Sequence, residues 1–173
     1  MNNIILILSQ VLGFIAFIIS LLAFHKNRKE KILGNMILSN LFDLIHYLLL
    51  GAYSGCITKL LAMCRNVFVI FKDKNKALSS NIFLYIFILT YTISGILTFE
   101  NVWSILPIIS AIIYAVAIWK GNELTLKKAA CFGYFLWLIY NILVLSISGI
   151  LSNIVSICSL FIAIKNNSKK QTA

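Results

Sequence analysis

The fold is decided by residues 4–31, which read IILILSQVLGFIAFIISLLAFHKNRKEK. The first 21 of them are almost wholly apolar, and that is long enough for an α-helix to cross the hydrocarbon core of a bilayer. The run then ends at a cluster of basic residues, which is typical of the cytoplasmic end of a transmembrane helix. We therefore predict that residues 4–24 span a membrane.

Further apolar runs follow along the chain. They are Ile32–Leu50, Cys56–Phe71, Asn81–Thr98, Trp103–Trp119, Ala129–Leu145 and Ile150–Ile164. Several are shorter than the roughly 20 residues that a spanning helix needs, so we expect their ends to extend into the flanking loops. Seven spans leave no room for a soluble domain, and only 12% of the residues are charged. We predict a single all-α integral membrane domain, residues 1–173, with seven transmembrane helices.

The basic residues predict the orientation of these helices. The net charge is +10, and most Lys and Arg lie in four short segments, 26–31, 72–76, 120–128 and 165–170. None is interleaved with stacking aromatics, which argues against a nucleic-acid partner. The other loops carry almost no charge. The positive-inside rule then predicts a multi-pass membrane protein with an external N-terminus and a cytoplasmic C-terminus.

The two ends of the chain also resemble each other. A shift of 94 residues aligns them without a gap and brings Ser54–Gly55 onto Ser148–Gly149, with lysine-bearing loops in register. We predict two parallel three-helix repeats, about 8–76 and about 102–170, joined by a connector helix at about 81–99. This 3+1+3 arrangement is typical of sugar transporters of the SWEET type, whose repeats are related by an axis along the membrane normal.

Charged side chains inside the apolar runs are candidates for a functional site, because each costs at least a few kcal/mol in hydrocarbon. Asp43 and His46 lie in the second run, and Lys59 and Arg65 lie in the third. With the hairpin turn placed near Tyr53 and a rise of about 1.5 Å per residue, Asp43 and Arg65 fall at the same depth. We predict an Asp43–Arg65 ion pair near the middle of the membrane, with His46 above it.

Polar side chains elsewhere extend this cluster into a predicted pocket. Gln10 adds an amide on the first helix, and Trp137 and Asn141 share one face of the sixth. An aromatic wall opposite a charged wall suits a small polar organic molecule. The predicted substrate-binding residues are therefore Asp43, His46, Arg65, Trp137, Asn141 and Gln10. The alternative is that such amides and hydroxyls only bond neighbouring helices and that the aromatics only pack.

The sequence contains no recognisable catalytic motif. The chain has no HExxH, GxSxG or P-loop motif, no CxxC pair, and Asp43 is the only acid deep in an apolar run. We expect no enzymatic activity, no cofactor and no metal site. Pro107 falls in the fifth apolar run and predicts a kink there.

Two segments carry a family resemblance. Residues 9–20 read SQVLGFIAFIIS, residues 45–53 read IHYLLLGAY, and Arg65 follows further along the chain. Together they resemble the YgjV-type bacterial inner membrane proteins, a group that looks related to the PQ-loop and SWEET-like superfamily. The likeness covers about residues 9–71, and the chain lacks the Pro-Gln dipeptide of PQ-loop proteins proper. The resemblance implies a location in the bacterial plasma membrane, and beyond that it concerns the fold more than the activity.

Two functional hypotheses follow. The first is a transporter or facilitator for a small solute, a polar or acidic metabolite, bound near mid-membrane between the two repeats. The second is a receptor or an assembly protein that uses the same scaffold without transport. A continuous cavity between the repeats favours the first, and a packed, dry core favours the second. The sequence leaves the oligomeric state open, a homo-oligomer included.

Overall fold

The computed structural model describes residues 3–24, 29–72, 75–120 and 123–171. Over these residues the chain forms seven α-helices and no strand, which confirms the predicted all-α fold. The helices are α1 (Asn3–Phe24), α2 (Lys29–Leu49), α3 (Tyr53–Lys72), α4 (Asn81–Leu97), α5 (Ile105–Lys120), α6 (Glu123–Leu143) and α7 (Ile147–Gln171). Short 3-10 turns, η1 (Lys76–Ser79) and η2 (Val102–Ser104), precede α4 and α5. Parts of three predicted basic loops, 25–28, 73–74 and 121–122, lie outside the described residues.

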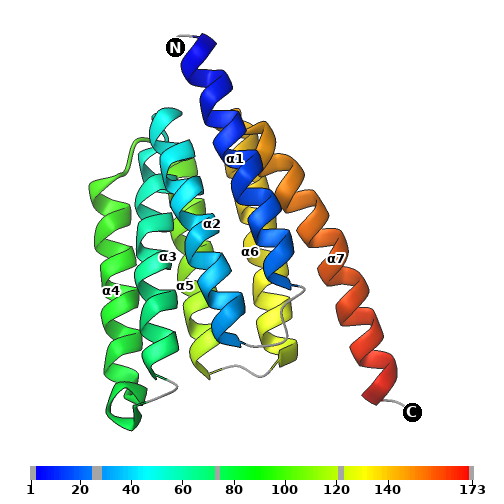
Figure 1. Ribbon diagram of the computed structural model, residues 1–173. Helices are drawn as coiled ribbons and strands as arrows, with labels where there is room; N and C mark the ends of the chain where they lie inside the picture. The colour runs from blue at the N-terminus through cyan, green and yellow to red at the C-terminus, as the bar shows by residue number, and fades with distance from the viewer. Residues whose placement is uncertain (1–2, 25–28, 73–74, 121–122, 172–173) are drawn as a thin grey trace.

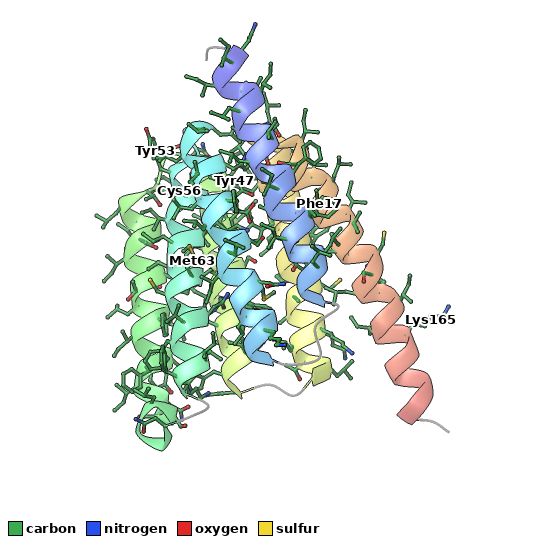
Figure 2. The ribbon with its side chains drawn as sticks, in the orientation of Figure 1. Phe17, Tyr47, Tyr53, Cys56, Met63 and Lys165 are labelled. Carbon is green, nitrogen blue, oxygen red and sulfur yellow. The ribbon has the colours of Figure 1, made fainter. Side chains whose placement is uncertain are left out.

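The outer surface of the bundle is apolar. Among the described helices, three segments are long and apolar enough to cross a membrane, Asn3–Leu22, Tyr53–Lys72 and Val102–Lys120, and Asn81–Leu97 and Ile147–Ile162 are shorter apolar helices. Large apolar side chains such as Ile18, Leu89 and Phe161 are exposed, whereas many serines and asparagines are buried. Figure 2 shows carbon-rich side chains projecting outward from the helices. A water-soluble protein has the reverse distribution. The surface is therefore that of a protein surrounded by lipid.

Six of the helices close into a ring. Along this ring α1 packs against α2, α2 against α3, α3 against α5, α5 against α6, α6 against α7, and α7 against α1 (Figure 1). Helix α4 lies outside, against α3 and α5, where Tyr91 and Leu84 pack on Ile108 and Ala111 of α5. The N-terminus and the C-terminus lie at opposite ends of the bundle (Figure 1). The three tight turns α2–α3, α4–α5 and α6–α7 all lie at the N-terminal end.

Two of these turns depend on residues with positive φ. Gly51 has φ of 70° and lets α3 begin at Tyr53, so the turn is centred on Gly51. In the α6–α7 turn the corresponding bend falls on Leu145, with φ of 55°. A leucine in this conformation costs about 1–2 kcal/mol. The strain is offset by contacts that the turn makes with α1, described below.

The predicted kink at Pro107 was placed wrongly. Pro107 is the third residue of α5, because the helix begins only at Ile105 after the 3-10 turn Val102–Ser104. In the first turn of a helix the backbone N–H has no intrahelical partner, so proline is tolerated there without breaking the hydrogen-bond ladder. The residue therefore shapes the start of α5 rather than its middle.

Candidate functional site

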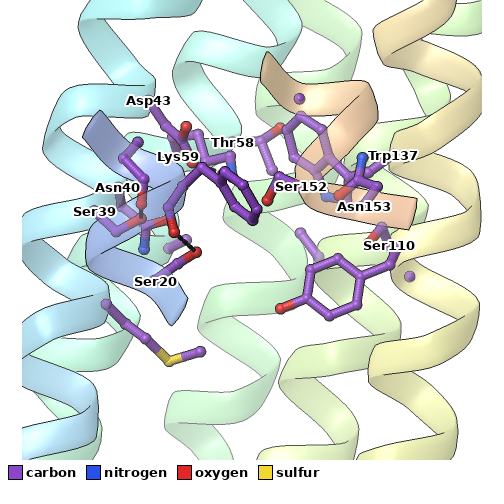
Figure 3. Close-up of a pocket in the computed structure, with 18 of the residues that line it drawn as sticks. Ser20, Ser39, Asn40, Asp43, Thr58, Lys59, Ser110, Trp137, Ser152 and Asn153 are labelled. Carbon is purple, nitrogen blue, oxygen red and sulfur yellow. Dashed lines mark hydrogen bonds and ion pairs between the residues drawn. The ribbon is translucent and has the colours of Figure 1, made fainter. Parts of the chain in front are cut away.

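A polar cavity of about 150 Å³ lies inside the ring of six helices. Its lining residues come from α1, α2, α3, α5, α6 and α7. Figure 3 shows hydroxyl and amide side chains from different helices, among them Ser39, Ser110 and Asn153, around this space. Four of the predicted site residues, Asp43, Arg65, Trp137 and Asn141, line it. The interior of the bundle is therefore polar and hollow where a structural membrane protein is usually packed.

The ion pair in this cavity joins Asp43 to Lys59, and the predicted Asp43–Arg65 pair is wrong. Lys59 Nζ lies 2.7 Å from Asp43 Oδ2, and the two side chains are only about one-fifth exposed. The error has a simple cause, because the turn was placed near Tyr53. With the turn centred on Gly51, Asp43 and Lys59 each lie eight residues from it and so meet at equal depth.

Lys59 also contacts the aromatic side of the cavity. Its Nζ lies 4.5 Å from the ring centroid of Trp137 and 5.9 Å from that of Tyr47, which gives the ammonium group cation–π partners. Tyr47, Trp137 and Tyr140 themselves form a cluster with ring centroids 5.4–6.1 Å apart. The predicted charged and aromatic walls thus meet, and Lys59 is the residue that joins them.

Among the charged cavity-lining residues that the structure describes, Arg65 is the one without an ionic partner. It is 5% exposed, and its Nη2 donates a 3.2 Å hydrogen bond to Asn66 Oδ1. Its guanidinium carbon lies 4.9 Å from the ring centroid of Tyr114. Within the described part of the chain, Arg65 Nε and the buried Asn153 Nδ2 have no hydrogen-bond partner. Two buried donors on the cavity wall therefore remain unsatisfied.

His46 and Gln10 lie beside the cavity rather than in its lining. The Ser9 carbonyl can only accept, so His46 Nδ1–H donates to it at 2.6 Å, and Nε2 of the neutral ring accepts from the Ser146 hydroxyl at 2.7 Å. Gln10 Nε2 donates to the Leu145 carbonyl at 3.0 Å. Both side chains therefore hold α1 and α2 to the α6–α7 turn.

Further hydrogen bonds join helices at the same end of the bundle. The Tyr47 hydroxyl donates to Asn141 Oδ1 at 2.7 Å, in the buried interior. The Tyr140 oxygen accepts from Ser54 Oγ at 2.9 Å and from the Gly55 backbone N–H at 3.1 Å. These bonds link α6 to α2 and to the start of α3 towards the N-terminal end of the bundle.

Sequence reasoning missed two features of this site. Lys59 was considered but left out of the predicted site, although its charge within an apolar run was the signal. Asn153 is the position that the 94-residue shift aligns with Lys59, and it was not among the predicted site residues. The signal in the sequence was therefore a polar amide, Asn153, at the repeat position equivalent to the charged Lys59.

The apolar exterior and the polar, charged interior define the class, an α-helical integral membrane protein. Comparison with protein families then gives the particular group. The chain belongs to the Imp-YgjV family of bacterial inner membrane proteins, whose model matches residues 7–171. Neither the curated proteins nor the solved structures gave a match. The match confirms the resemblance to YgjV-type proteins and the assignment to the bacterial inner membrane.

Proposed function

We propose that this protein transports, or facilitates the passage of, a small solute across the bacterial inner membrane and has no enzymatic role. The observation that carries the proposal is the cavity of about 150 Å³ enclosed by six helices, with Arg65, Asp43 and Lys59 on its wall. Serines that only bond helices together do not require a hollow interior. A packed core would have favoured a receptor or an assembly protein instead.

The proposed architecture has seven transmembrane helices in one domain, with repeats at about 8–76 and 102–170 and a connector at about 81–99. Two kinds of contact support it. Helix α1 packs on α7, and α5 packs on α3. In the proposed repeat α1 corresponds to α5 and α3 corresponds to α7, so the two contacts are equivalent. The Tyr47–Asn141 hydrogen bond joins positions 94 residues apart, equal to the repeat shift. A residue touches its own equivalent only close to a two-fold axis.

The repeat also supports the proposed relation to the PQ-loop and SWEET-like superfamily, because SWEET transporters have parallel repeats. His46 on α2 bonds Ser146 at the start of α7, and Tyr140, its equivalent on α6, bonds Ser54 and Gly55 at the start of α3. The two halves thus hold each other reciprocally. In the proposed orientation, with the N-terminus external, these bonds lie at the external end of the bundle.

Flux into proteoliposomes tests the proposal. Stopped-flow light scattering would follow the entry of glycerol, lactamide and lactate into vesicles with and without the protein. We expect the protein to accelerate at least one solute. Ala62→Trp, whose indole projects into the cavity from a lining position, should abolish this acceleration. Val155→Trp, which adds the same side chain at an exposed position of α7, should leave it unchanged. Equal rates with and without protein for every solute would support the receptor or assembly alternative.

A further inference from the structure

The charges on the cavity wall do not cancel. Among the described lining residues, the charged ones are Asp43, Lys59 and Arg65. Asp43 and Lys59 neutralise each other at 2.7 Å. Arg65 therefore leaves the empty cavity with one uncompensated positive charge.

The protein itself satisfies this charge only in part. A guanidinium has five N–H donors, and a single hydrogen bond, to Asn66, engages the Arg65 group within the described residues. The face of Tyr114 adds a cation–π contact of about 0.5–2 kcal/mol. Burying an ion costs several kcal/mol even after relaxation. An arginine side chain is not deprotonated in proteins, so the remaining cost favours a partner from outside the chain.

A second unsatisfied donor lines the cavity from a helix that does not adjoin α3 in the ring. Asn153 is 5% exposed, and its Nδ2 has no partner in the part of the chain that the structure describes. It comes from α7, whereas Arg65 comes from α3, so the two donors approach the cavity from different helices. Donors in excess of acceptors, together with a net positive charge, are the complement of an anion with several acceptor oxygens.

We infer that the cavity binds a small carboxylate, with Arg65 as its ionic partner and the Asn153 amide as a second donor. A planar carboxylate offers two oxygens that match the guanidinium fork, whereas a spherical ion does not. The cavity, of about 150 Å³, has room for a small molecule. This inference adds a substrate class to the proposed transport function and rests on that function.

Binding is tested first, on the purified protein in detergent. The unfolding temperature would be followed against lactate, its uncharged analogue lactamide, and chloride. Lactate should raise it saturably, and lactamide and chloride should not. Arg65→Gln should weaken lactate binding about tenfold or more, the effect expected from the loss of a charge-assisted hydrogen bond. Arg65→Lys should retain part of the binding. Equal effects of lactate and lactamide, or of lactate and chloride, would overturn the carboxylate assignment.

A second variant keeps Arg65 in place. Asn153→Asp adds a carboxylate to the cavity wall, brings the net charge of its lining to zero and should likewise weaken lactate binding about tenfold or more. Asn101→Asp adds the same charge at an exposed turn outside the cavity, and aspartate caps a helix as asparagine does, so its lactate binding should stay within about twofold of wild type. Unchanged lactate binding by Asn153→Asp would refute the proposed site.

The flux experiment separates the inference from the proposed function. Lactate flux lost in Arg65→Gln supports both. Protein-dependent flux of glycerol and lactamide without a preference for lactate would sustain transport and overturn the carboxylate site. Lactate binding without flux of any solute would sustain the site and overturn transport. Absence of both would overturn both.

Discussion

Replacing Asp43 with asparagine removes one half of the buried ion pair, and the structure lets us work out the cost. The charges lie 2.7 Å apart, and the side chains of Lys59 and Asp43 are 19% and 20% exposed. At an effective dielectric constant of about 20 they attract by roughly 6 kcal/mol before desolvation is subtracted. Breaking a fully buried pair typically costs about 3–5 kcal/mol. Because Lys59 keeps its contact with Trp137, we expect Asp43→Asn to cost about 2–3 kcal/mol.

A double-mutant cycle isolates the pair. Lys59→Gln alone should cost about 3 kcal/mol, since Asp43 then remains buried without an ionic partner. Asp43→Asn with Lys59→Gln leaves two neutral amides and should cost only about 2–3 kcal/mol, which implies a coupling of roughly 2–3 kcal/mol. The free energy of unfolding would be measured by titrating SDS into mild-detergent micelles. Asp43→Asn with Arg65→Gln serves as the control and should be nearly additive. A Lys59 coupling below about 0.5 kcal/mol, or a larger coupling to Arg65, would refute this assignment.

Three further predictions concern the turn end and the topology. His46→Ala removes two buried hydrogen bonds and should cost about 2–4 kcal/mol of unfolding free energy, while the affinity for lactate stays within about twofold; a loss of affinity without a loss of stability would place His46 in the binding site after all. Gly149→Ala would bring its Cβ to 2.5 Å from Ser146 Oγ and should cost about 1–3 kcal/mol, whereas Gly34→Ala meets nothing within 4 Å and should be neutral or stabilising; equal effects of the two would contradict the close packing at the turn. A reporter fused after Ala173 should read as cytoplasmic in whole cells, and an external signal would exclude the proposed orientation.

The fold was largely predictable because the membrane imposes a simple pattern. Each apolar run between basic or turn residues became one helix, and every helix except α4, which ends at Leu97 inside its run, extends beyond its run at one end or both. The α7 helix, for example, begins at Ile147 rather than Ile150. The sequence did not determine the exact residue at which a turn is centred. A shift of two residues at Gly51 was enough to give Asp43 the wrong partner.

The direction in which each side chain points within the bundle could also not be predicted from the sequence. Asp43 and His46 are three residues apart, which separates them by about 60° around the helix. Asp43 therefore faces the cavity, while His46 reaches Ser9 on α1 and Ser146 at the α6–α7 turn. A spacing of three residues puts both on roughly the same side of α2, but which neighbour each meets depends on how α1, α2 and α7 pack around that side.

The bonds at the turn end bear on how a solute could pass. Between described residues, six hydrogen bonds of 3.3 Å or shorter join the first three helices to the last three there, and each involves Gln10, His46, Tyr47 or Tyr140. At about 1 kcal/mol net for each bond, separating the two halves at this end costs roughly 6 kcal/mol. A minor state populated at 0.1–10% lies only about 1.4–4 kcal/mol above the major one. Alternating access therefore requires the opposite end to gain at least about 2 kcal/mol as it closes. Under the proposed function a bound anion supplies such a gain, because it neutralises the Arg65 charge that otherwise opposes closer packing of the helices around the cavity.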